Sequence, residues 1–62
     1  MMNRIKKQGM DYYFMTMGCV NGIYSSLEEA IHRAKLEGMK EIVFEEVSVI
    51  GYEVYKKETI IL

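Results

Sequence analysis

The 62-residue sequence predicts a small α+β domain of order ββαββ, in which one helix packs on one face of an antiparallel sheet. Two observations predict this class. Only residues 25–38 carry helix signals at both ends, and the flanking segments are rich in the aromatic and β-branched residues that favour strands. Because one helix covers one face of a small sheet, we expect the other face to be polar, bound to a ligand or packed against a second chain.

The helix is the best-marked element. Ser25 and Ser26 each stand three residues before a glutamate, which is the capping-box pattern of a helix start, and Gly38 supplies a left-handed stop. Leu36 projects to the side opposite the expected core stripe. That stripe, which we expect to face the sheet, comprises Leu27, Ala30, Ile31 and Ala34.

The segment before the helix contains two predicted parts. We interpret residues 1–9, which are basic and lack periodicity, as a flexible arm or an edge strand, and residues 10–62 as a single α+β domain. Residues 10–20 form a β-favouring run with apolar side chains on both alternating sets, which predicts a strand buried on both faces. The chain should then turn at Asn21-Gly22, because a type I′ hairpin turn needs positive φ at both central positions.

The segment after the helix is also rich in strand-forming residues. Residues 42–44 begin a strand, Glu45-Glu46 interrupts the alternation as a bulge would, and Gly51 offers a bend before a last strand. The apolar triplet at residues 60–62 is unusual for a chain end that is not tied into a sheet. We expect this last strand to pair within its own chain or with a partner.

Composition excludes several classes of function. There is one cysteine and one histidine, so we expect no internal disulfide, no metal site and no cofactor. The net charge of −1 argues against a general phosphate-binding surface. No run approaches the roughly 20 apolar residues of a membrane span, and no signal-peptide pattern is present. We therefore expect a cytoplasmic protein without membrane contact.

His32 and Cys19 each allow two interpretations. His32 lies one helical turn after Glu28, which could orient an imidazole for acid-base chemistry. The simpler interpretation is an exposed helical histidine beside a carboxylate, because no nucleophile or metal ligand accompanies it, and we predict no catalytic residue. Cys19 has no neighbouring cation to activate its thiol, which favours a small half-buried filler over an intermolecular disulfide.

Aromatic and charged side chains mark a candidate surface for a partner. Aromatic residues on open sheets can stack on nucleic-acid bases, and Tyr12 and Phe14 share one strand face. A protein interface explains such residues without requiring basic neighbours, so we expect a protein partner and consider nucleic acid unlikely. The candidate residues for binding a partner or nucleic acid are Tyr12, Phe14, Glu29, His32 and Arg33.

The small size of the chain favours self-association. Domains of about 60 residues bury only about 60% of the surface of the unfolded chain, and they usually need reinforcement. With neither a disulfide nor a metal expected, a homodimer or higher oligomer is the remaining ordinary solution. The candidate interface residues are Leu36, Tyr52, Val54, Tyr55, Ile60, Ile61 and Leu62.

Residues 13–37 resemble the small viroplasmin-like domain found at the amino end of some ribonucleases H. The matching positions are an aromatic strand residue, a glycine-led triplet and the start of the helix: Tyr13, Gly22, Ile23, Tyr24 and Ser26. The resemblance implies a module that binds an RNA/DNA duplex. The chain lacks the tryptophan and the basic glycine-aromatic segment that help those domains hold the duplex, so this function is an alternative.

These observations favour a non-catalytic protein-binding protein that acts as a homodimer and inhibits another protein by occupying its surface. Its size and character are typical of accessory proteins of bacteriophages and mobile elements that inhibit host defence proteins, an analogy that rests on no motif. Two alternatives stay open. One is the nucleic-acid-binding module, and the other is a protein that sequesters a small ligand between two chains.

Overall fold

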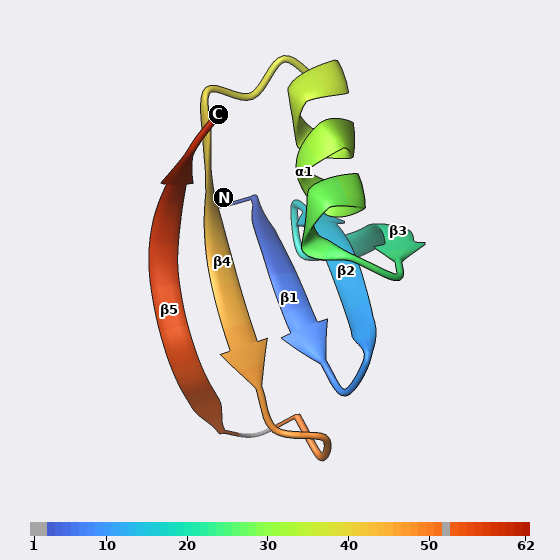
Figure 1. The fold of residues 1–62 in the computed structure, drawn as a ribbon, viewed down its shortest axis with the longest axis vertical. Coiled ribbons are helices and arrows are strands. Elements are labelled where there is room, and N and C mark those ends of the chain that lie inside the picture. Colours follow the sequence, from blue (N-terminus) through green and yellow to red (C-terminus); the bar gives the residue numbers. More distant parts are fainter. Residues whose placement is uncertain (1–2, 52) are drawn as a thin grey trace.

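The computed structural model describes residues 3–51 and 53–62. Within them, one helix packs on one face of a five-stranded sheet whose strand order is β3-β2-β1-β4-β5 (Figure 1). The predicted α+β class with one helix on one face is confirmed, and the chain has one more strand than predicted before the helix. The elements are β1 Arg4–Gln8, β2 Asp11–Thr16, β3 Cys19–Tyr24, α1 Leu27–Leu36, β4 Glu41–Val47 and β5 Val54–Ile61.

The sheet is mixed, so the prediction of an antiparallel sheet is wrong. β1 runs parallel to β4, with Arg4 opposite Val43, whereas the other neighbouring strands are antiparallel. Parallel neighbours need a long connection, and here it consists of β2, β3 and α1. β4 and β5 pair within the chain, and their register shifts between Glu46 and Val47, near the predicted interruption.

β1 lies in the middle of the sheet. The prediction that residues 1–9 form a flexible arm or an edge strand is therefore wrong for residues 4–8, and the first two residues of the chain lie outside the described part. β1 buries only Ile5, which is 0% exposed, and its other residues are polar and half-buried. Because the strand has only one buried apolar side chain, its sequence shows no alternation of apolar and polar residues. The sequence pattern therefore did not indicate a central strand.

The β2–β3 hairpin turns earlier than predicted. The turn falls at Met17 and Gly18, whose φ values of 53° and 79° suit a two-residue type I′ loop. The predicted turn at Asn21-Gly22 is wrong. These two residues lie inside β3, where the register with β2 shifts after Phe14 and leaves Asn21 as the extra residue of a β-bulge.

The helix forms as predicted. Ser26 is the N-cap, and its Oγ accepts a hydrogen bond of 3.2 Å from the backbone N–H of Glu29. Gly38 follows the helix with a φ of 82°, which is the expected left-handed stop. The predicted stripe faces the sheet, with two members buried and two half-buried: Ala30, Ala34, Leu27 and Ile31.

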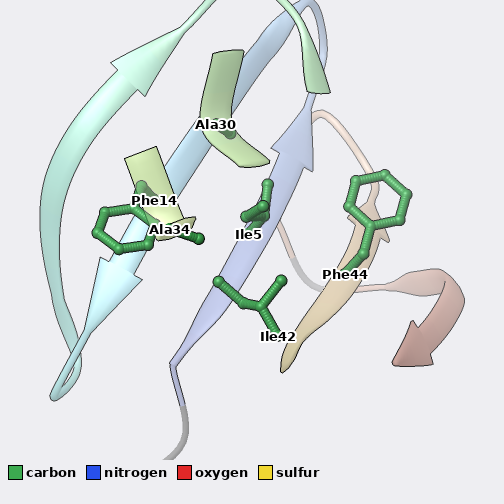
Figure 2. Packing of buried hydrophobic residues seen from close by; sticks show 6 residues of the cluster. All are labelled: Ile5, Phe14, Ala30, Ala34, Ile42 and Phe44. Atoms are coloured by element: carbon green, nitrogen blue, oxygen red, sulfur yellow. The ribbon is translucent and has the colours of Figure 1, made fainter. Parts of the chain in front are cut away.

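The core lies between α1 and the sheet (Figure 2). Ile5 is at its centre, because its register partners are Phe14 on β2 and Phe44 on β4. The small side chains of Ala30 and Ala34 let the helix approach the sheet closely. The fully or nearly fully buried cluster comprises Ile5, Phe14, Ala30, Ala34, Ile42 and Phe44.

Because β1 lies in the middle of the sheet, truncating its isoleucine should lower the free energy of unfolding far more than truncating an isoleucine at the edge. Ile5→Ala removes a fully buried side chain and should lower the free energy of unfolding by about 2–5 kcal/mol. The matched control is Ile61→Ala, since Ile61 is 76% exposed on β5 and its truncation should change the value by less than about 0.5 kcal/mol. Urea unfolding measures both, and equal effects would contradict the placement of β1.

Candidate binding surface

The face of the sheet opposite α1 has no element covering it in the described part of the chain (Figure 1). Because side chains alternate along a strand, the residues on either side of Ile5 point toward this face, which we call the open face. Its central row crosses all five strands in register and comprises Ile23, Tyr13, Lys6, Glu45 and Lys57.

Three cations surround one carboxylate at the centre of the open face. The side chain of Glu45 is nearly buried, and its Oε1 accepts a hydrogen bond of 3.3 Å from Nη1 of Arg4. Lys6 on β1 and Lys57 on β5 flank Glu45 in register. The Lys6 ammonium lies 5.7 Å from the centre of the Tyr13 ring, within the range of a cation–π contact. The centre therefore carries more positive than negative charge.

Exposed apolar side chains border this charged centre on both edge strands. Val20 and Ile23 on β3 are 48% and 60% exposed, and Ile61 is exposed near the end of β5, opposite Glu41. Met15 lies opposite Arg4 and is buried although no helix covers it. The open face thus places charged side chains at its centre and exposed apolar side chains toward its edges.

Tyr12 and Phe14 lie on the helix side of the sheet. Phe14 is 0% exposed, and the Arg33 guanidinium lies 5.3 Å from its ring centre. Tyr12 is half-buried and stacks on Phe44 at a centroid distance of 6.4 Å. These two candidate residues for binding a partner or nucleic acid therefore pack on the core side and are not part of the open face. The aromatic residue of β2 on the open face is Tyr13, which could be identified only after the face covered by the helix was known.

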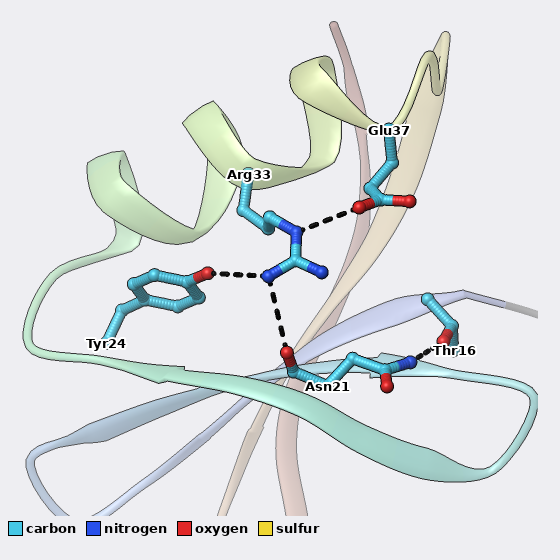
Figure 3. A network of polar contacts seen from close by, with 5 residues as sticks. All are labelled: Thr16, Asn21, Tyr24, Arg33 and Glu37. Carbon is cyan, nitrogen blue, oxygen red and sulfur yellow. Dashed lines mark hydrogen bonds and ion pairs between the residues drawn. The ribbon is translucent and has the colours of Figure 1, made fainter.

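Arg33 joins the helix to the bulge of β3 (Figure 3). Its Nε donates to Oε2 of Glu37 at 3.0 Å, and its Nη1 donates to the Tyr24 hydroxyl at 3.2 Å and to the Asn21 carbonyl at 3.3 Å. The bond to Tyr24 and then the bond to Glu37 raise the pKa of Arg33 above its usual value. Asn21 also donates from Nδ2 to Oγ1 of Thr16. Arg33 thus stabilises the edge of the fold.

Glu29 and His32 line a shallow hollow beside the start of the helix. The hollow has a volume of about 500 Å³, and Tyr24 and Glu28 complete its lining. Hydrogen bonds from the hydroxyl of Ser25, at 2.7 Å, and from that of Ser26, at 3.2 Å, lower the pKa of Glu29. In residues 3–51 and 53–62, no group of three or more histidine, cysteine or acidic side chains could hold a metal ion.

The residues predicted for self-association fall into three groups. Ile60 and Leu62 pack against the chain's own core, and the Leu62 N–H donates to the Lys40 carbonyl at 2.9 Å. Tyr52 lies outside the described residues. The exposed candidates are Leu36, Val54, Tyr55 and Ile61.

Cys19 is exposed at the start of β3. The interpretation of this residue as a half-buried filler is therefore wrong. The cause is the position of the hairpin turn, which places Cys19 directly after Gly18 at the tip of the hairpin.

No protein-family model matches the chain, and no curated protein and no solved structure matches it. Among the described residues, no helix combines the length and the apolar character needed to cross a membrane.

The lowered pKa of Glu29 predicts a pH dependence of stability. Since the pKa is below the usual value of 4.5 in the folded chain, the contribution of Glu29 is fully present above that value and is lost as the pH falls through the folded pKa. We expect Glu29→Gln to be less stable than wild type at neutral pH, and the difference to close in acid. Thermal unfolding across pH measures this. A difference that stays constant down to about pH 2 would contradict the role of the two serine hydroxyls.

Proposed function

We propose that this chain is a small non-catalytic protein-binding protein that acts as a homodimer and inhibits another protein by occupying its surface. The observation that carries this proposal is the open face, which combines a charged centre with exposed apolar side chains on both edge strands. A partner protein can meet this face with side chains of complementary charge and apolar character. The effect on the target would be steric, because the bound chain excludes other partners from the covered area.

The aromatic residues favour protein over nucleic acid as the partner. Single-strand binding needs aromatic rings that are open to stacking, yet Tyr12 and Phe14 face the core. Tyr13 is half-buried, and Lys6 lies over its ring. The aliphatic borders at Ile23 and Ile61 match apolar groups of a protein better than they match phosphates.

The outer edge of β5 supports self-association. Val54 and Tyr55 are 54% and 68% exposed there, and an edge strand offers unpaired backbone groups to a second chain. A dimer would present the open face twice. Two linked contacts can raise the apparent affinity by orders of magnitude if the geometry of the target permits both.

The open face makes a testable prediction about capture of the partner. Tagged wild-type protein should retain one protein from a lysate of the cells in which the chain acts, and Ile23→Lys should lose it because a charge replaces an apolar contact. Met10→Lys is the matched control, since Met10 is 87% exposed in the β1–β2 turn, away from the open face. Retention by Ile23→Lys, or capture of nothing by wild type, would contradict the proposal.

Self-association through the edge of β5 should be measurable as the molar mass of the protein in solution. Light scattering of wild type should give twice the chain mass of 7.3 kDa. Tyr55→Lys should shift the mass toward the monomer because it places a charge within the proposed contact. Val49→Lys changes a residue that is 78% exposed in the β4–β5 loop, and it should leave the mass unchanged. A wild type that is monomeric at every concentration would exclude the dimer.

A further inference from the structure

We infer that the open face binds a short acidic segment of a protein partner, with carboxylates at Lys6 and Lys57 and an apolar side chain at Ile23. This inference rests on the proposed function, because it names the chemistry of the partner that the open face would bind. It is carried by the distribution of charge across the sheet.

Two lysines at the centre of the open face lack a carboxylate partner in the described chain. On the helix side, Lys7 pairs with Glu46 at 3.6 Å and Lys56 pairs with Glu58 at 3.7 Å. On the open face, Glu45 pairs with Arg4, and neither Lys6 nor Lys57 forms an ion pair with any described residue. Lys6 and Lys57 lie two strands apart, or about 10 Å. They can therefore receive two carboxylates from one extended segment.

The remaining charges of the open face limit the direction in which that segment can run. Asp11 and Glu41 share this face and lie toward opposite ends of their strands, with Asp11 opposite Gln8 and Glu41 opposite Ile61. These carboxylates would repel further acidic residues along the strand direction. A segment that crosses the strands avoids them, and seven extended residues, about 20 Å, span the five strands, which cover about 19 Å.

The borders of the open face fix the pattern of the segment. In an extended chain, alternate residues face the same side, so one apolar residue and the two acidic residues that follow it can all contact the sheet. The apolar end would meet Val20 and Ile23 on β3, which are exposed, whereas Ile61 lies opposite Glu41 near the end of β5, away from the central row. A nucleic acid offers phosphates but no aliphatic groups for these borders. The charge and the borders together favour a protein segment.

An NMR titration of the ¹⁵N-labelled chain tests this inference with three probes. The first is the peptide Ile-Ser-Glu-Ser-Glu-Ser-Ser with blocked ends, the second is the same peptide with lysine in place of glutamate, and the third is a dT oligonucleotide. We expect the acidic peptide alone to shift amide resonances at the centres of β1, β4 and β5. The double variant Lys6→Gln/Lys57→Gln should weaken this binding by about tenfold.

The double variant Lys35→Gln/Lys40→Gln is the matched control, because both lysines are exposed, lie outside the sheet strands and carry the same charge. It should bind the acidic peptide like wild type, and circular dichroism should show both double variants folded. No shift with the acidic peptide, or equal shifts with the lysine peptide, would overturn the inference. Tighter binding of the dT oligonucleotide through the same lysines would replace it with nucleic-acid binding.

The capture experiment separates this inference from the proposed function. If Lys6→Gln/Lys57→Gln retains a partner that Ile23→Lys loses, the open face binds protein without the acidic chemistry, and only this inference fails. If wild type captures no protein and no peptide shifts its resonances, both fail.

Discussion

The parallel pairing of β1 with β4 determines how both faces of the sheet are built. It places a mostly polar strand in the middle of the sheet and brings Phe14 and Phe44 to either side of Ile5. The resulting sheet is about 19 Å wide, whereas a helix with its side chains is about 10 Å wide. α1 accordingly packs on β1, β2 and β3, and the core side of β4 is covered by half-buried residues, including Met39 and Ile60.

The same strand serves both faces of the sheet. On the helix side, Ile5 fills the core and Lys7 lies over the ring of Tyr12. On the open face, Arg4 pairs with Glu45 and Lys6 lies over Tyr13. A polar central strand is therefore compatible with the fold because only one of its side chains has to be buried. The proposed function uses the polar residues that the core does not need.

Local signals in the sequence predicted the helix but could not show the sheet order. The serine cap, the alanine-containing stripe and Gly38 act within a few residues of one another, and all are found as expected. The partner of β1 lies beyond two strands and the helix, and no local pattern reports such a pairing. Asn21-Gly22 misled the turn prediction because neither residue adopts the positive φ that a type I′ turn needs, whereas Met17 and Gly18 both do.

The candidate surface was only partly predictable for the same reason. Alternation along β2 separates Tyr12 and Phe14 from Tyr13, but the sequence did not show which set faces the helix. The exposure of Leu36, Val54, Tyr55 and Ile61 agrees with the expectation that apolar residues remain outside the core. The row of Lys6, Glu45 and Lys57 could not be predicted without the register of β1, β4 and β5. Of these strands, β1 and β4 pair in parallel.

Thiol labelling can show whether a partner protein covers the open face. In a Cys19→Ser background, a cysteine is placed at Ile23 or at Leu36, which are 60% and 71% exposed on opposite sides of the molecule. We expect the partner to slow labelling of Ile23→Cys and to leave labelling of Leu36→Cys unchanged. Slower labelling of Leu36→Cys with no change for Ile23→Cys would place the interface on the helix and exclude the open face.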